Sequence, residues 1–178
     1  MRTLVLGGIR SGKSRWAEDA IARSLAPGQS VRYLASGLDV GTDTAWAQRV
    51  AQHRSRRPAH WSTVETHDIT TQLRQPPHTA TLIDDLGGWL TTTLDRHQAW
   101  DSGSVAAPVQ EMIAAVSSFP ATLVLVSPEV GLTVVPATAS GRRFADELGS
   151  LNQSIAALCD HVVLVVAGQP VPIKPFGA

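Results

Sequence analysis

The chain has 178 residues, and its 15 Lys and Arg balance 15 Asp and Glu to a formal net charge of zero. That balance argues against a nucleic-acid binder relying on bulk positive charge, and the single cysteine excludes an internal disulfide framework and cysteine-rich zinc sites. The length predicts a single domain over residues 1–178, and no apolar run is long enough for a membrane span, so we expect a cytoplasmic protein with no nucleic-acid partner.

The first half of the chain alternates short apolar runs with amphipathic segments. Apolar runs of strand length, most of them ended by polar residues or glycine, predict strands at 3–6, 31–35, 61–65 and 79–83. Helical spacing of apolar residues predicts helices at 14–25 and 41–57, with a short one at 69–73. Pro27-Gly28 ends the first of these helices, and Pro58 ends the second.

The second half continues the alternation. Helices are predicted at 88–100, 109–118 and 138–160, and strands at 122–127 and 162–167. In the last helix, apolar residues three and four apart form a stripe along one face: Phe144, Leu148, Leu151, Ile155 and Leu158. Strands that are apolar on both faces and separated by helices predict an α/β fold, a mostly parallel sheet with helices on both faces. In such a sheet ligands bind at the carboxyl ends of the strands.

The most specific motif follows the first predicted strand. The segment Gly7-Gly8-Ile9-Arg10-Ser11-Gly12-Lys13-Ser14 fits the pattern G-x-x-x-x-G-K-[ST] and leads into a predicted helix. Such a loop directs backbone N–H groups at a phosphate chain, Lys13 reaches the β- and γ-phosphates, and the Ser14 hydroxyl ligates Mg²⁺. The sequence therefore predicts a P-loop NTPase-like fold; the alternative is a glycine-rich turn that binds nothing.

Two aspartates follow the strand predicted at 79–83. Asp84 stands first after the strand, where P-loop proteins carry an acid that helps to hold Mg²⁺, and we predict that role for it. The alternative is that Asp84 and Asp85 only cap the next helix, and for Asp85 that interpretation is sufficient.

The helix predicted at 41–57 carries a basic face. Arg49, His53 and Arg56 or Arg57 are spaced so that they share one side of the helix. Neighbouring positive charges favour a neutral imidazole, which is a nucleophile able to form a covalent intermediate. With a P-loop in the same chain, this suggests nucleotidyl transfer through a phosphohistidine. The alternative is a solvated basic face with an ordinary surface histidine.

Beyond these motifs, the chain resembles a known family over nearly its whole length: the bifunctional adenosylcobinamide kinase/adenosylcobinamide-phosphate guanylyltransferases of cobalamin biosynthesis. The resemblance rests on the P-loop and on the segments Tyr33-Leu34-Ala35-Ser36, Arg49-Val50-Ala51-Gln52-His53-Arg54, Arg57-Pro58 with Trp61, Leu82-Ile83-Asp84, Glu129-Val130-Gly131, Val135-Pro136 and Asn152-Gln153.

The resemblance implies two reactions on a corrinoid substrate. ATP or GTP phosphorylates the aminopropanol hydroxyl of adenosylcobinamide, and GMP is then transferred from GTP to that phosphate through a GMP–histidine intermediate. His53 stands at the matching histidine position, and Glu65 is implied to read the guanine. The remaining residues implied to contact the nucleotide are Ala35, Ser36, Gly37, Arg54, Ser55, Arg56, Arg57 and Asp84. The resemblance also implies a homotrimer with active sites near subunit boundaries.

Two positions depart from the family pattern. Pro128 stands where the family usually has an asparagine, and Asp85 stands where a cysteine is common. Neither departure changes Lys13, Ser14, His53 or Asp84. Two other functions remain as alternatives: a P-loop small-molecule kinase without a covalent intermediate, and a GTP-binding module without catalysis.

Overall fold

The computed structural model describes residues 1–36 and 57–174. Within them, one seven-stranded sheet has the order β3-β2-β4-β5-β1-β6-β7. Every neighbouring pair is parallel except β6 and β7, which are antiparallel. The strands are β1 (Arg2–Gly7), β2 (Arg32–Ala35), β3 (Ser62–Glu65), β4 (Thr81–Asp84), β5 (Leu123–Pro128), β6 (His161–Val166) and β7 (Gln169–Lys174).

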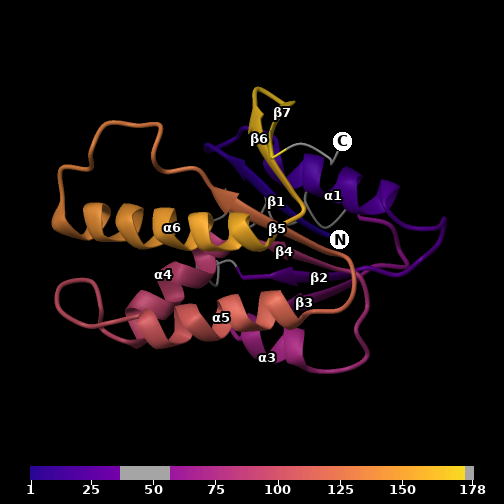
Figure 1. Ribbon diagram of the computed structural model, residues 1–178, viewed down its shortest axis with the longest axis horizontal. Coiled ribbons are helices and arrows are strands. Elements are labelled where there is room, and N and C mark those ends of the chain that lie inside the picture. Colours follow the sequence, from indigo (N-terminus) through magenta and orange to yellow (C-terminus); the bar gives the residue numbers. More distant parts are fainter. Residues whose placement is uncertain (37–56, 175–178) are drawn as a thin grey trace.

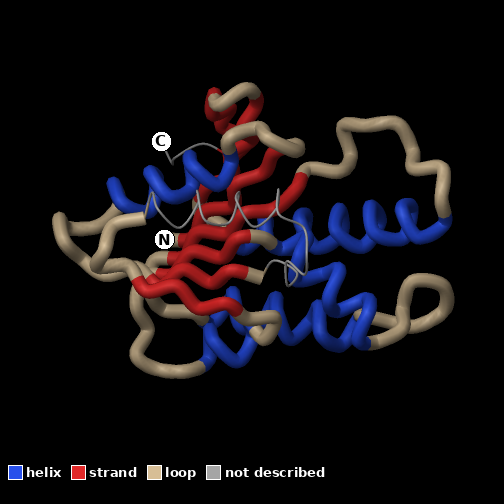
Figure 2. Tube along the Cα trace, turned by 180° about the vertical axis from the view of Figure 1, so that it is seen from behind, coloured by secondary structure: helices blue, strands red, loops and turns tan. Residues whose placement is uncertain are grey.

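Helices cover both faces of this sheet (Figures 1 and 2). The helices are α1 (Lys13–Arg23), α3 (Ile69–Arg74), α4 (Leu86–Arg96), α5 (Ala106–Ser118) and α6 (Ala139–Leu158). The α1 side holds one apolar cluster, which includes Val5, Ile21 and Tyr33. The other side holds a larger cluster, to which α3, α4, α5 and α6 all contribute. The predicted α/β class, a mostly parallel sheet with helices on both faces, is confirmed.

The predicted stripe on the last long helix is confirmed too. Leu148, Leu151 and Ile155 are fully buried, and Phe144 and Leu158 pack against the same cluster. Because these residues recur at helical spacing, they place one side of α6 against the sheet.

Three differences between the structure and the sequence prediction have a clear physical basis. A last strand, β7, follows β6, where no element was predicted, and it contains prolines, which strands disfavour. Helix α4 begins at Leu86, before the predicted start at residue 88, because the side chain of Asp85 caps it, and it ends at Arg96. Helix α5 begins at Ala106, since Pro108 fits within the first helical turn instead of delaying it.

The strand order brings the carboxyl ends of β1, β2 and β4 to one edge of the sheet. From β1 the chain passes through α1 to β2, which lies three places away in the sheet. It later returns through β4 to β5, which lies on one side of β1, and then to β6, which lies on the other side. Such a change of direction creates the usual ligand crevice of open α/β sheets. The P-loop follows β1 at this edge.

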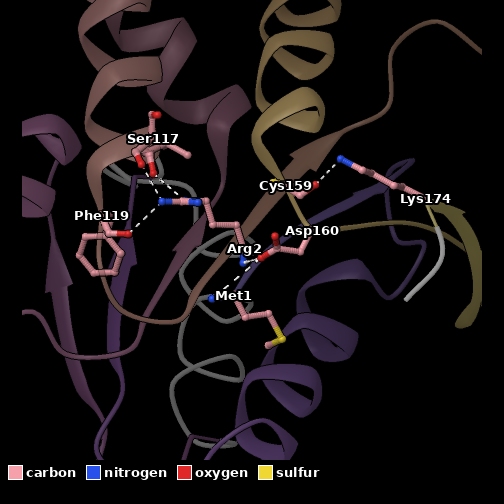
Figure 3. A network of polar contacts seen from close by, with 8 residues as sticks. Met1, Arg2, Ser117, Phe119, Cys159, Asp160 and Lys174 are labelled. Carbon is pink, nitrogen blue, oxygen red and sulfur yellow. Dashed lines mark hydrogen bonds and ion pairs between the residues drawn. The ribbon is translucent and has the colours of Figure 1, made fainter. Parts of the chain in front are cut away.

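A polar network fastens the opposite edge, where the strands begin (Figure 3). The Arg2 side chain donates hydrogen bonds to the carbonyls of Val116, Ser117 and Phe119 at the end of α5. The Arg2 backbone N–H donates to Asp160 Oδ2 at 2.7 Å, at the start of β6. A positive side chain at a helix carboxyl end is favourable. Through these hydrogen bonds Arg2 joins β1 to the ends of α5 and α6. In the described parts of the chain, no helix has the length and apolar character to cross a membrane.

Candidate active site

The glycines of the P-loop and the β6–β7 hairpin together fix the conformation of the loop. Gly12, just before α1, has φ of 93°, a left-handed conformation that favours glycine. A Cβ on Gly7 would lie 2.8 Å from the carbonyl oxygen of Val165, so only glycine fits there. The N–H of Gly168, in the hairpin turn, donates to the carbonyl of Ser11 at 2.8 Å. The loop therefore rests on β6–β7 and turns directly into α1.

Lys13 and Ser14 open helix α1. Lys13 Nζ donates to the carbonyl of Gly8 at 3.3 Å, so its side chain bends back over the loop. The Lys13 N–H donates to Ser11 Oγ at 3.3 Å, and the amino end of α1, with the positive end of the helix dipole, favours an anion. The eight predicted loop residues, Gly7, Gly8, Ile9, Arg10, Ser11, Gly12, Lys13 and Ser14, thus lie in one continuous strand–loop–helix unit.

Asp84 lies opposite Ser14, as the last residue of β4. Ser14 Oγ donates to Asp84 Oδ1 at 3.2 Å. A hydroxyl and one carboxylate beside a phosphate loop form a suitable donor set for Mg²⁺, which takes oxygen ligands and completes its shell with phosphates and water. In residues 1–36 and 57–174 no three His, Cys, Asp or Glu side chains gather as a metal site. These two residues fit the ion only together with a phosphate ligand.

Asp85 caps a helix, whereas its neighbour Asp84 faces Ser14. Asp85 Oδ1 accepts from the N–H of Gly88 at 2.8 Å and so caps α4, which confirms the capping interpretation. Burial, and then the charge of Asp84, raise the pKa of the Asp85 carboxyl. Ser36, just after β2, links the ends of β2 and β4. Its N–H donates to the carbonyl of Asp84 at 3.1 Å, and its hydroxyl donates to the carbonyl of Asp85.

Behind Asp84 lies a group of four side chains, here called the Arg57 cluster: the buried Glu18, Tyr33 and Arg57, with the half-buried Thr63. The Tyr33 hydroxyl donates to Asp84 Oδ2, so both carboxylate oxygens have a partner. Burial, followed by the charge of Asp84, raises the pKa of Tyr33 well above its ordinary value, and the phenol therefore stays a donor at neutral pH.

Sequence reasoning assigned no function to Glu18 or to Tyr33. Glu18 follows Ser14 by four residues on α1 and is buried beside Ala17 and Ile21. A charged residue on the apolar face of a predicted helix was the available signal, since such residues are seldom buried without a partner. Tyr33 is the only tyrosine of the chain, but inside an apolar strand it reads as a core residue.

The other predicted site residues are spread along the same sheet edge. Ala35 and Glu65 end the neighbouring strands β2 and β3, and they are partners in the register of the sheet. Strand β3 is four places from β1, or about 19 Å at ordinary strand spacing, so only a ligand lying across the edge would contact both Glu65 and the P-loop. Predicted residues outside the described ranges are Gly37, His53, Arg54, Ser55 and Arg56.

Pro128, one of the two departures from the family pattern, ends β5 beside the P-loop. Its carbonyl accepts from Asn152 Nδ2 at 3.0 Å, which ties α6 to the strand end. The ring packs toward Gly87, where a Cβ would lie 2.8 Å from the proline Cγ. In this chain, therefore, the side chain at 128 contributes packing against the start of α4.

Comparison with known proteins shows the family of the chain. The sequence model of the family described as cobinamide kinase / cobinamide phosphate guanyltransferase matches residues 3–173. The chain belongs to this family. The bifunctional adenosylcobalamin biosynthesis protein CobP of Pseudomonas aeruginosa is 41% identical over 179 residues, covering 98% of each chain. The bifunctional adenosylcobalamin biosynthesis protein CobU of Escherichia coli K12 is 36% identical over 187 residues, covering 98% of this chain and all of that one.

Membership of the cobinamide kinase / cobinamide phosphate guanyltransferase family confirms the predicted enzyme class, a bifunctional kinase and guanylyltransferase of cobalamin biosynthesis. Among solved structures, the P4 protein from bacteriophage phi6 in complex with ADP aligns with 95% of this chain and 52% of its own, at 14% identity and a TM-score of 0.46. That likeness is too low to inform the site.

Proposed function

We propose that this chain phosphorylates the aminopropanol hydroxyl of adenosylcobinamide, with ATP or GTP as donor, and then transfers GMP from GTP to the new phosphate through a GMP–His53 intermediate. Adenosyl-GDP-cobinamide and pyrophosphate are the products. The observation that carries this proposal is the P-loop opening α1 opposite Asp84, in a chain of the cobinamide kinase / cobinamide phosphate guanyltransferase family.

In the kinase step, the substrate hydroxyl oxygen forms a bond to the γ-phosphorus. The bond between that phosphorus and the β–γ bridging oxygen breaks, the nucleoside diphosphate leaves, and the hydroxyl proton is released. The P-loop N–H groups and Lys13 hold the β- and γ-phosphates and stabilise the charge that develops on them. Ser14 and Asp84 would hold Mg²⁺, which neutralises phosphate charge when it is bound.

In the guanylyl step, an imidazole nitrogen of His53 forms a bond to the α-phosphorus of GTP, and pyrophosphate leaves from the P-loop. An oxygen of adenosylcobinamide phosphate then attacks the same phosphorus, and the P–N bond breaks to free His53. Glu65 accepts hydrogen bonds from the guanine N1 and N2 donors, which favours GTP over ATP in this step. Arg54 and Arg56 lie close to His53 in the sequence, where positive charge favours phosphate binding.

Labelled GTP tests the covalent step. The purified protein is incubated with Mg²⁺ and GTP labelled at the α-phosphorus, without a corrinoid, and is then denatured. We expect label on the chain that is stable to base and labile to acid, as a phosphoramidate is, and no label on His53→Ala. The variant should still bind GTP and phosphorylate adenosylcobinamide. If wild-type protein binds GTP without acquiring label, the covalent mechanism is wrong, and corrinoid phosphorylation then separates a plain kinase from a non-catalytic GTP-binding module.

We further infer a cytoplasmic homotrimer. The support is the family resemblance, in which active sites lie near subunit boundaries. Light scattering of the purified protein should give a molar mass three times that of the 18.9 kDa chain, and a monomer at enzyme-assay concentrations would contradict the inference.

A further inference from the structure

The Arg57 cluster joins three elements behind the candidate active site. Arg57 Nε lies 3.7 Å from Glu18 Oε1, and these side chains are only 8% and 10% exposed. The guanidinium carbon of Arg57 lies 3.3 Å from the centroid of the Tyr33 ring. Its Nη1 donates to Thr63 Oγ1 at 3.0 Å, in β3. The Arg57 side chain is thus held by a buried carboxylate, a buried aromatic face and the hydroxyl of the half-buried Thr63.

The cluster continues to the carboxylate that faces Ser14. The Tyr33 hydroxyl donates to Asp84 Oδ2, which leaves Oδ1 for the hydrogen bond from Ser14. Ser14 and Glu18 stand one turn apart on α1, so the same helix carries the hydroxyl at the site and the counter-charge of Arg57. The chain of contacts runs from Glu18 through Arg57 and Tyr33 to Asp84.

We propose that Arg57 is a positioning residue for Asp84: by holding the Tyr33 ring, it keeps the carboxylate turned so that Oδ1 faces Ser14. This inference rests on the proposed function, in which Ser14 and Asp84 hold Mg²⁺. It differs from the role that the family resemblance implies for Arg57, which is direct contact with the nucleotide. A guanidinium stacked on a buried tyrosine acts on Asp84 through packing and one hydrogen bond.

Two substitutions break the contact chain at different links. Tyr33→Phe keeps the ring against Arg57 but removes the hydroxyl that holds Asp84. Arg57→Met keeps an apolar side chain of similar length but removes the stacked guanidinium, and it is combined with Glu18→Gln so that no buried charge loses its partner. Arg2→Ala is the matched control, since it weakens the fold at the opposite edge of the sheet.

The experiment separates metal affinity from nucleotide affinity. Electron paramagnetic resonance measures Mn²⁺ binding to the protein–GDP complex, and calorimetry in EDTA measures GDP binding without metal. We expect Tyr33→Phe and Glu18→Gln/Arg57→Met to weaken Mn²⁺ binding about tenfold or more, as loss of a group that orients a metal ligand does. GDP affinity in EDTA should not change, and Arg2→Ala should change neither affinity.

Each result that would contradict the proposal has its own meaning. Wild-type Mn²⁺ affinity in Tyr33→Phe overturns the proposal, whether or not the double variant folds, because the link from Arg57 to Asp84 passes through the Tyr33 hydroxyl. Loss of metal-free GDP affinity in the double variant, with none in Tyr33→Phe, would instead favour a nucleotide contact by Arg57. Asp84→Asn distinguishes a failure of the proposed function: if it leaves Mn²⁺ binding intact, Asp84 is not a metal ligand and the inference falls with that role.

Discussion

Cys159, the only cysteine of the chain, lies buried beneath the carboxyl end of α6. Burial, and then the charge of Asp160, raise the pKa of its thiol to about 12. Since the thiolate is the reactive form, the native thiol should be inert at pH 8. We expect mass spectrometry to find no iodoacetamide adduct on the folded protein and complete modification in urea. Rapid modification of the folded protein would show that the end of α6 opens readily.

Asp160 makes the free energy of unfolding depend on pH in the acid range. The hydrogen bond from the Arg2 N–H lowers the pKa of this carboxyl below its ordinary 3.8. Because the folded-state pKa is the lower one, the stabilisation is present above pH 3.8 and is lost as the pH falls through the folded-state value. We expect Asp160→Asn to lower the free energy of unfolding at pH 7, by under about 1 kcal/mol for so exposed a group. In urea titrations its difference from wild type should shrink below pH 3.8; a constant difference would contradict this account.

At the scale of the element, the longest described helix depends on its first hydrogen bond. Thr138 Oγ1 accepts from the N–H of Gly141 at 3.1 Å and so caps α6. We expect Thr138→Ala to lower the free energy of unfolding by about 1 kcal/mol, and Thr138→Ser, which keeps the hydroxyl, to change it much less. Urea titration monitored by circular dichroism measures both variants. Equal losses in the two variants would show that the threonine methyl, not the cap, stabilises the helix.

The elements show which structure can be read from local sequence. The period of α6 and the P-loop pattern are local, so both were predictable. Strand β7 was not, because its prolines disfavour a strand and only the partner β6 makes one. The Arg57 cluster was beyond prediction for a related reason: Glu18, Tyr33 and Arg57 are far apart along the chain, and no periodicity links a helix, a strand and a loop.

For the whole molecule, β1 joins the two apolar clusters. Leu4 packs on the side of α6, Val5 packs on the side of α1, and both are fully buried. Leu4→Ala should lower the free energy of unfolding by about 2–5 kcal/mol, as truncation of a buried leucine does. Because the clusters share one sheet, we expect a single transition in urea, with coincident circular dichroism and tryptophan fluorescence. Two separate transitions would show that the faces unfold independently.

The prolines of β7 have a consequence for behaviour at high concentration. Pro170 and Pro172 pair with Val165 and Val163 of β6 at alternate positions, whose backbone groups face the same side of the strand. Proline has no N–H and is accepted in a strand only where that side faces outward. The outer border of β7 therefore lacks amide donors at these positions, so another chain cannot add a regular strand there. Exposed strand borders are common starting points of aggregation, and these prolines keep this one from seeding intermolecular sheets.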